Sequence, residues 1–202
     1  MNIKKVPHLI IATKNAGKVR EFRDLLLPLQ CAVLSLADLS IDAEFEETGE
    51  TFAENARQKA LAYSSLTLTP VLADDSGLEV EALGGRPGIY SARYAGAGAS
   101  DADRVRKLLD ELRKSDANRG ARFVCALAMA QQGALILESE GECRGFIAEE
   151  PRGSNGFGYD PIFYFPELGK TYAELSRLEK NLHSHRSRAV SSLIRQMVDP
   201  QL

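Results

Sequence analysis

The sequence predicts an α/β or α+β fold, in which strands are mixed with helices. Short apolar runs bounded by turn residues, at 8–12 and 71–73, are typical of buried strands. Between and after them, apolar residues recur at intervals of three and four, which is typical of amphipathic helices. No repeat or linker divides the 202 residues. We therefore expect a single domain over residues 1–202, a globular unit of one or two lobes.

The chain opens with a predicted strand, loop and helix. Residues 8–12 (HLIIA) form the strand and residues 13–17 (TKNAG) the turn that follows it. The apolar side chains that then share one helical face are Val19, Phe22, Leu25, Leu26 and Leu29.

A second helix and a second strand follow. Thr51 and Glu54 match a capping box, which predicts a helix over 51–65. The apolar run 71–73 predicts a short strand that ends at Asp74. Residues 84–88 (GGRPG) are a strong turn signal.

The rest of the chain adds helices around a strand pair. A helix is predicted over 101–114, and two strands over 121–130 and 134–147 pair around the turn at 131–133. A final helix is predicted over 184–198, with Val190, Leu193, Ile194 and Met197 on one face.

Composition excludes several classes of function. The chain is 44% apolar and 26% charged, which is ordinary for a globular protein. A net charge of −3 and a pI near 5.7 disfavour a nucleic-acid-binding protein. Three separated cysteines form neither a zinc set nor a CxxC pair, and the N-terminal apolar patch is too short for a signal peptide or a membrane span. These features predict a cytoplasmic protein with reduced thiols and no membrane partner.

A first candidate site lies at the junction of the first strand and helix. Such a junction directs backbone N–H groups and the positive end of the helix dipole toward a ligand, and phosphate suits both. Lys18 adds a full charge. The segment is not a P-loop, because Ala12 and Val19 stand where that motif needs glycine and a hydroxyl residue. An ordinary surface loop with solvated lysines is the alternative.

Carboxylates form a second candidate site. Glu46 and Glu47 precede Thr48-Gly49, and Asp74 and Asp75 follow the short strand. A carboxylate at the end of a buried strand is held rigidly where α/β folds bind ligands. Magnesium suits such oxygen ligands, and an aspartate there could also activate water. The alternatives are a solvated acidic loop and a simple turn or helix cap.

Two segments near the C-terminus could bind a base. In residues 156–161 (GFGYDP), Phe157 and Tyr159 could stack on a flat ring, and Asp160 could accept hydrogen bonds from its N–H groups. Residues 180–186 (KNLHSHR) place two histidines beside Lys180 and Arg186, whose donors would read the O6 and N7 acceptors of a purine. A tight turn with core aromatics and a basic, solvated helix start are the structural alternatives.

Together these segments resemble the family of inosine triphosphate pyrophosphatases, also described as Ham1-like non-canonical purine NTP pyrophosphatases. The matching pieces appear in the family's order. They are TKNAGK at 13–18, EETGETFAENARQKA at 46–60, LADDSGLEVEALGGRPGIYSARYAG at 72–96, GFGYDPIF at 156–163 and SHR at 184–186.

The resemblance implies a role for each matched residue. The triphosphate would contact Thr13, Lys14, Asn15, Ala16, Gly17, Lys18, Asn55 and Lys59, with Ser76 also touching substrate. Magnesium would bind Asp75 and either Glu46 or Glu47, which the sequence does not separate, and Asp75 would also accept the proton. The base would be held by Phe157, Gly158, Tyr159, Asp160, Lys180, His185 and Arg186.

The resemblance also implies an activity and an architecture. The activity is hydrolysis of ITP, dITP, XTP and dXTP to the monophosphate and pyrophosphate, by water attack on the α-phosphorus. The architecture is an elongated mixed β-sheet with flanking helices, in two lobes around a central cleft, and a homodimer. Three departures bear on pocket shape only: His183 replaces a common aliphatic residue, Ser187 a frequent glycine, and 139–146 lacks a tryptophan.

Three other functions compete with this interpretation. A Maf-type nucleotide pyrophosphatase would share the chemistry and differ in base choice, but SHR and GFGYDPIF argue against it. A module that binds triphosphates without cleaving them is disfavoured by Lys18 and Asp75. A nucleic-acid-binding role is weakest, because the acidic chain has no basic stripe.

Overall fold

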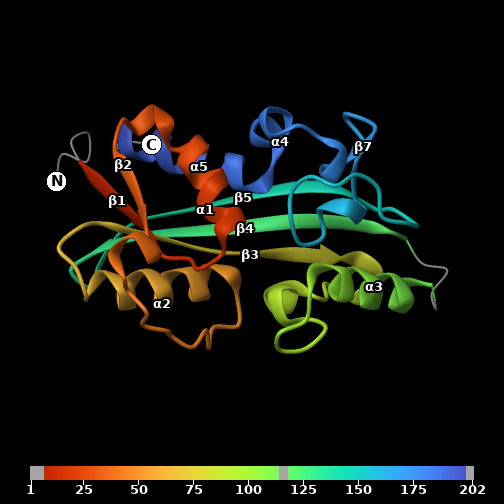
Figure 1. Ribbon diagram of the computed structural model, residues 1–202, viewed down its shortest axis with the longest axis horizontal. Helices are drawn as coiled ribbons and strands as arrows, with labels where there is room; N and C mark the ends of the chain where they lie inside the picture. The colour runs from red at the N-terminus through yellow and green to blue at the C-terminus, as the bar shows by residue number, and fades with distance from the viewer. Residues whose placement is uncertain (1–6, 114–117, 199–202) are drawn as a thin grey trace. The chain divides into compact units, whose positions relative to one another are not determined.

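The computed structural model describes residues 7–113 and 118–198, and within these the strands form one mixed seven-stranded sheet in the order β2-β1-β3-β4-β5-β6-β7 (Figure 1). The strands are β1 His8–Ile11, β2 Ala32–Ser35, β3 Val71–Val80, β4 Gly120–Gln131, β5 Ala134–Ile147, β6 Phe163–Phe165 and β7 Lys170–Thr171. The helices are α1 Ala16–Leu25, α2 Phe52–Ser64, α3 Asp101–Leu112, α4 Arg177–His183 and α5 His185–Val198. The predicted mixed sheet with flanking helices is thereby confirmed.

The sheet changes from parallel to antiparallel pairing along its width. Strand β1 pairs in parallel with β2, where Leu9 faces Val33, and with β3, where Ile10 faces Val71. Strand β6 pairs antiparallel with β5 and β7. Strands β4 and β5 follow each other through a two-residue turn in which Gln132 and Gly133 both have positive φ, as a tight hairpin requires.

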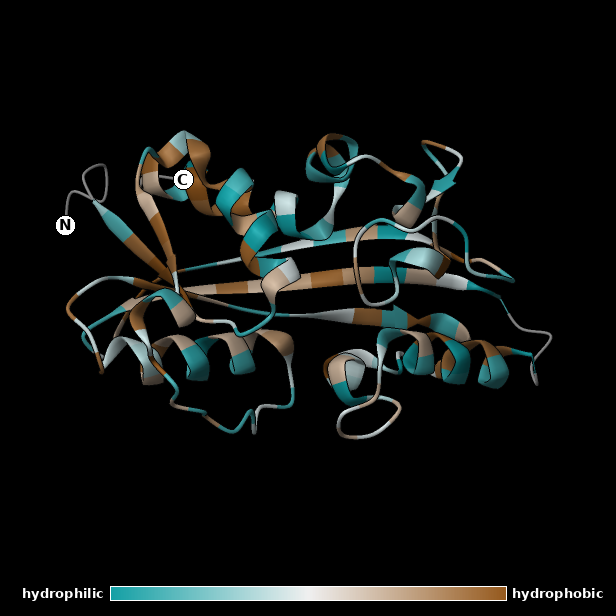
Figure 2. Cartoon of the chain, viewed as in Figure 1, coloured by the Kyte–Doolittle hydropathy of each residue, from teal (hydrophilic) through white to brown (hydrophobic). Residues whose placement is uncertain are grey.

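The chain contacts divide the molecule into two compact units, each with its own core. Unit 1 contains residues up to Asp75, Cys125–Gly141 and the segment from Arg186 onward, and unit 2 contains Ser76–Val124 and Glu142–His185. The prediction that both belong to one domain stays a prediction. Figure 2 shows hydrophobic residues concentrated on the central strands, whereas the helices carry both hydrophobic and hydrophilic stretches.

In unit 1, helices cover both faces of the strands (Figure 1). The core on the α1 and α5 face joins side chains of those helices to alternate residues of β1, β3 and β4, and it contains Leu9, Ile11, Phe22, Leu26, Leu72, Cys125, Leu127, Met129, Ala189, Val190 and Leu193. Helix α2 lies on the other face of the strands. Within this unit, a side chain of β3 therefore meets different helices according to the face on which it lies.

In unit 2, α3 shares one hydrophobic core with residues of β3, β4, β5 and β6. Its apolar stripe is Val105, Leu108, Leu109 and Leu112, and all four side chains lie in a core with Phe123 and Phe163. A complete capping box between Ser100 and Asp103 starts this helix. The predicted helix over 101–114 is confirmed to Leu112, and residue 114 lies outside the described residues.

Two expectations about element boundaries are wrong. The strand predicted at 71–73 continues through Asp74, Asp75, Ser76 and Gly77 to Val80. Those letters favour a turn in isolation, but here they pair within the sheet. Lys180 and His183 are not at the start of the last helix either. They belong to a separate helix, α4, which ends where Ser184 takes an extended conformation before α5.

Candidate active site

The two adjacent aspartates of β3 lie on opposite faces of the sheet, because successive strand residues alternate. Both are buried, with Asp74 1% and Asp75 7% exposed. Asp74 shares the face of Leu72, which α1 and α5 cover, and Asp75 faces α2. The expected carboxylate at a strand end is thus corrected: both groups lie in the middle of a ten-residue strand.

Asp74 is surrounded by cations of unit 1. Lys18 on α1 places Nζ 2.8 Å from Asp74 Oδ2, and Arg186 on α5 places a terminal nitrogen 3.8 Å from the same oxygen. Burial raises the pKa of Asp74, but the charges of Lys18, Arg186 and Lys59 outweigh it and lower the pKa to about 2. Asp74 is therefore a permanently charged anchor for cations.

Asp75 has the opposite electrostatic character. Its burial, followed by the negative charge of Glu47, raises the pKa of Asp75 to about 6, against the opposing effects of Lys18, Lys59 and Asn55. Asn55 Nδ2 donates a hydrogen bond to Asp75 Oδ2 at 3.0 Å. A carboxylate with a pKa near neutrality is suited to accept a proton in a reaction.

Asn55 links Asp75 to the loop that follows Glu47. Its side chain is fully buried, and its Oδ1 accepts from the backbone N–H of Gly49 at 2.8 Å. The amide thereby ties α2 both to Asp75 and to the loop that follows Glu47. The expected contact between Asn55 and the triphosphate stays a prediction, and Asn55 also lines a cavity beside Glu47 and Lys59.

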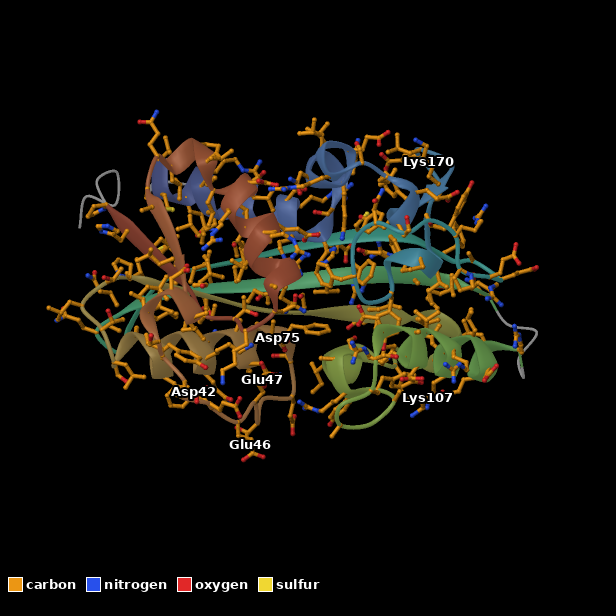
Figure 3. All side chains as sticks on the ribbon, in the orientation of Figure 1. Asp42, Glu46, Glu47, Asp75, Lys107 and Lys170 are labelled. Carbon is orange, nitrogen blue, oxygen red and sulfur yellow. The ribbon has the colours of Figure 1, made fainter. Side chains whose placement is uncertain are left out.

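Glu47 and Lys59 border the Asp75 side. The two side chains form an ion pair, and Lys59 Nζ also donates to the backbone oxygen of Asp74 at 3.0 Å. A cavity of about 180 Å³ brings Glu46, Glu47, Asn55 and Lys59 together. Glu46 is exposed and lies farther out on the loop, whereas Glu47 is half-buried and lies nearer Asp75 (Figure 3). The geometry therefore favours Glu47 over Glu46 as the partner of Asp75.

The predicted phosphate loop is built as a helix N-terminus. Asn15 caps α1, and its Oδ1 accepts from the backbone N–H of Lys18 at 3.1 Å. Thr13, Lys14 and Ala16 line a cavity of about 500 Å³ beside this helix end. Lys14 itself pairs with Asp42 and Glu44, at 3.0 and 2.8 Å, and both carboxylates raise its pKa.

In unit 2, the two C-terminal motifs meet around one buried ion pair. Lys180 and Asp160 are 5% and 3% exposed, and Lys180 Nζ donates to Asp160 Oδ2. The same carboxylate oxygen accepts from the backbone N–H of Phe157 at 2.9 Å, and Lys180 Nζ lies 4.8 Å from the centre of the Phe157 ring. A side chain at position 156 would clash with Asp160, which explains Gly156 there.

The neighbours of this cluster are packed as core residues. The ring of Tyr159 is 4% exposed within the core of unit 2, and its hydroxyl donates to the backbone oxygen of Ser91 at 2.9 Å. Tyr159 thus packs in the core next to the loop, and contact of Phe157 and Tyr159 with a base stays a prediction. His185 stacks on Phe123 with ring centroids 4.7 Å apart.

Two residues that hold Arg186 and the 156–161 loop were not predicted from the sequence. Glu21 on α1 forms a buried ion pair with Arg186, and Asp101 at the start of α3 accepts from the backbone N–H of Gly158 at 2.6 Å. The sequence could have indicated Glu21, since it lies next to Phe22 on the buried side of its helix. Nothing in the sequence indicates Asp101, because an acidic residue in the first turn of a helix is ordinary.

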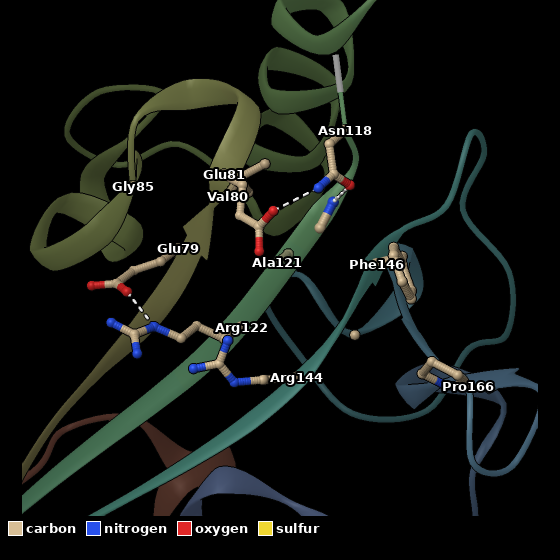
Figure 4. A pocket seen from close by; sticks show the side chains of 12 residues that line it. Glu79, Val80, Glu81, Gly85, Asn118, Ala121, Arg122, Arg144, Phe146 and Pro166 are labelled. Carbon is tan, nitrogen blue, oxygen red and sulfur yellow. Dashed lines mark hydrogen bonds and ion pairs between the residues drawn. The ribbon is translucent and has the colours of Figure 1, made fainter.

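A cavity of about 570 Å³ in unit 2 has a different character. Its lining includes Glu79, Arg122, Arg144 and Phe146. In Figure 4, dashed lines join Arg122 to Glu79, 2.6 Å apart, and Asn118 to Glu81, 2.7 Å apart. None of the predicted site residues lines it, and we assign it no role.

No helix within residues 7–113 and 118–198 is long and apolar enough to cross a membrane. Across the same residues, no three His, Cys, Asp or Glu side chains gather as a metal cluster. All three cysteines are free, as expected.

The chain is similar to known proteins over nearly its whole length. A model of the Ham1 family matches residues 9–196. The dITP/XTP pyrophosphatase of Geobacillus kaustophilus is 55% identical over 186 residues, 92% of this chain and 91% of that protein. That of Bacillus subtilis is 51% identical over 185 residues, 91% and 93% of the two chains. The solved structure of a HAM1 protein from Coxiella burnetii has a TM-score of 0.85 at 42% identity, and covers 95% of this chain and 98% of that one.

Proposed function

This chain belongs to the Ham1 family, and we propose that it is a pyrophosphatase that hydrolyses non-canonical purine nucleoside triphosphates to the monophosphate and pyrophosphate. The observation that supports this most directly is the pair of neighbouring buried aspartates with opposite pKa shifts, flanked by Lys18 and Lys59. Asp75 is suited to accept a proton, and Asp74 holds Lys18. The names of the relatives supply the substrate class, dITP and XTP.

The reaction needs one displacement. A water oxygen bonds to the α-phosphorus, the bond from that phosphorus to the oxygen that bridges to the β-phosphorus breaks, and pyrophosphate leaves with the electron pair. Asp75 takes the proton of the attacking water, for which a pKa of about 6 is suitable. Lys18 and Lys59 offset the charge of the triphosphate and of the leaving pyrophosphate.

The donor set next to Asp75 fits magnesium. The charge of Glu47 raises the pKa of Asp75, so the two carboxylates are close enough to repel each other, and a divalent cation would relieve that repulsion. We propose Asp75 and Glu47 as its protein ligands. The ion would supply charge neutralisation on the phosphate oxygens. The protein holds its own ligands in place through Asn55 and Lys59.

The remaining predicted residues are proposed to bind substrate on each unit separately. In unit 1, the backbone of Thr13–Lys18 would contact the phosphates at the start of α1. Ser76, the first residue of unit 2, would also touch the substrate. In unit 2, Phe157, Lys180 and His185 would bind the base, with Asp160 holding Lys180 and Tyr159 holding the loop. We also propose that the protein is cytoplasmic and forms a homodimer.

A substrate panel tests this function. Purified protein is incubated with MgCl₂ and ITP, dITP, XTP, GTP or ATP, and both pyrophosphate and monophosphate are quantified. We expect equal amounts of the two products, with ITP, dITP and XTP preferred. Preference for another base would support a Maf-type specificity, and binding without pyrophosphate release would support a sensing module. Release of single phosphates would place bond cleavage elsewhere and contradict the mechanism.

A further inference from the structure

The loop at residues 156–161 is anchored to the first turn of α3, a helix of the same unit. Asp101 Oδ2 accepts a hydrogen bond from the backbone N–H of Gly158 at 2.6 Å. The preceding backbone N–H, that of Phe157, donates to Asp160 Oδ2 at 2.9 Å. These two N–H groups belong to the peptide units before and after the Phe157 α-carbon, so a carboxylate holds each of the two peptide planes that direct the Phe157 ring.

Asp101 is itself held in a fixed orientation. Its Oδ1 accepts from the guanidinium of Arg104, one turn later on α3. Arg104 is fixed in turn, because another of its nitrogens donates to the backbone oxygens of Ala92 and Ala99 at 2.9 and 2.7 Å. The two oxygens of Asp101 thus have separate partners, the arginine on one side and the loop on the other.

Stability of α3 does not explain this arrangement. Ser100 and Asp103 already form a complete capping box at the start of the helix. The Asp101 side chain is 46% exposed, and an ion pair with that much solvent around it contributes little to folding. The loop gains more from the contact, because the glycines on both sides of Phe157 have positive φ and leave its backbone unusually free to rotate.

We propose that Asp101 is a positioning residue for base binding, which directs the Phe157 ring through the backbone N–H of Gly158. Phe157 is half-buried, and its ring centre lies 4.8 Å from Lys180 Nζ, the ammonium that is also proposed to bind the base. Truncating Asp101 leaves the peptide between Phe157 and Gly158 without this partner, so the peptide and the ring turn more freely. The loss then appears in binding of the base, and the proposed phosphate contacts of unit 1 are unaffected.

This inference rests on the proposed function for the contact between Phe157 and a base. Asp101 itself lies outside the five segments whose residues resemble the family. If Asp101 served only the helix, its loss would lower the free energy of unfolding and leave nucleotide affinity unchanged. If it positions Phe157, the affinity for a nucleotide falls, while the affinity for a phosphate compound without a base does not.

Binding of IMP and of inorganic pyrophosphate, measured by calorimetry in MgCl₂, tests the proposal. We expect Asp101→Ala to weaken IMP binding about tenfold, the scale of one hydrogen bond to a charged group, and to leave pyrophosphate binding unchanged. Asp110→Ala is the matched control, because Asp110 forms the same kind of i,i+3 pair with Arg113 on this helix, about 13 Å farther along its axis. It should leave both affinities unchanged. Equal losses for the two ligands in Asp101→Ala, or no loss for IMP, would overturn the proposal.

A double-mutant cycle with Phe157→Ala shows through which group Asp101 acts. The value of kcat/KM for dITP is measured in the wild type, the two single variants and the double variant, after urea unfolding has shown that each is folded. A residue that acts through the Phe157 ring has nothing left to position once the ring is gone, so Asp101→Ala should have no further effect in the Phe157→Ala background. Losses that multiply in the double variant would contradict the proposal, since Asp101 would then act independently of Phe157.

Hydrogen exchange, followed by mass spectrometry on peptides that cover residues 156–161, needs no turnover and keeps this test separate from that of the proposed function. Exchange in this loop should be faster in Asp101→Ala than in the wild type, and unchanged in Asp110→Ala. A wild type that binds IMP but cleaves no triphosphate would refute the proposed function, while the IMP affinities and the exchange rates still decide the role of Asp101. Unchanged exchange in Asp101→Ala would refute that role.

Discussion

Replacing Asp75 by asparagine should abolish turnover and, at the same time, stabilise the folded protein. The substitution keeps the shape of the side chain and an oxygen that can accept the hydrogen bond of Asn55. It removes the carboxylate that would accept the proton from water. It also removes a buried charge that faces the charge of Glu47.

The size and sign of the stability effect follow from the pKa of Asp75. The pKa is raised from 3.8 to about 6 on folding, so the folded protein holds this proton more tightly than the unfolded chain does. Ionisation therefore destabilises the folded state as pH rises from about 4 to about 6. At about 1.36 kcal/mol for each pKa unit, the penalty is on the order of 3 kcal/mol at pH 7.5 and about half of that at pH 5.

Urea unfolding in EDTA, with wild type and Asp75→Asn compared at pH 5.0 and 7.5, measures this difference. Subtracting the unfolding free energy of the wild type from that of the variant at each pH cancels the titration of the groups that both proteins share. We expect the variant to be more stable than the wild type at both pH values, and the difference in unfolding free energy to grow with pH. If that difference is absent, or is equal at pH 5.0 and 7.5, ionised Asp75 does not destabilise the folded protein. Retention of more than about a tenth of wild-type kcat, a barrier change under about 1.4 kcal/mol, would remove Asp75 as the base.

Three further predictions concern the phosphates, the metal and the base. Lys18→Ala should lower kcat/KM for every triphosphate by a similar factor, and a loss confined to ITP would mean that its segment acts on the base. Chelation of divalent ions should stop turnover, and added MgCl₂ should restore it. Glu47→Gln should raise the magnesium concentration needed for half-maximal rate more than Glu46→Gln does. An equal rise in both variants would mean that the two glutamates cannot be told apart as metal ligands. Lys180→Ala should lower kcat/KM for ITP more than for ATP, because an ammonium meets an acceptor on one base and an amine donor on the other, a difference of about 1–3 kcal/mol. Since Asp160 loses its buried partner in that variant, urea unfolding must confirm that it is folded before an unchanged ratio is taken to exclude base reading.

Local patterns predicted most of the elements that build the site. Helical periodicity and capping residues located α1, α2, α3 and α5, and a glycine turn located the β4 and β5 pair. The capping box of α2 is only half formed, since Thr51 accepts from the backbone of Glu54 while the Glu54 carboxylate turns to the N–H of Glu50. Strands β2, β6 and β7 were not predicted. Strands β6 and β7, with three and two residues, are too short to carry a period, and β2 lacks the longer apolar run that marked β1.

The part of the site that the sequence did not predict depends on contacts between residues that are distant in sequence. Residues 74–77 resemble a turn when read alone. In the folded chain Lys18 and Lys59 bind polar atoms of Asp74, and Asn55 binds Asp75, so the carboxylates find their partners on α1 and α2. The pair of Glu21 and Arg186 joins residues 165 positions apart. No spacing rule predicts such a contact, which depends on how helices and strands pack. The face on which each aspartate lies likewise became clear only once the strand was seen to continue.

The unbroken course of β3 through its two aspartates also limits how the gene can change. Asp74 and Asp75 are chemically identical, so their different roles depend only on the odd or even position of each residue counted along the strand. Inserting or deleting a single residue just before them would turn each aspartate to the opposite face of the sheet while leaving both amino acids in the sequence. Ancestral and descendant sequences are thus free to lengthen neighbouring loops, but the residue count between Val71 and Asp75 should be inherited unchanged.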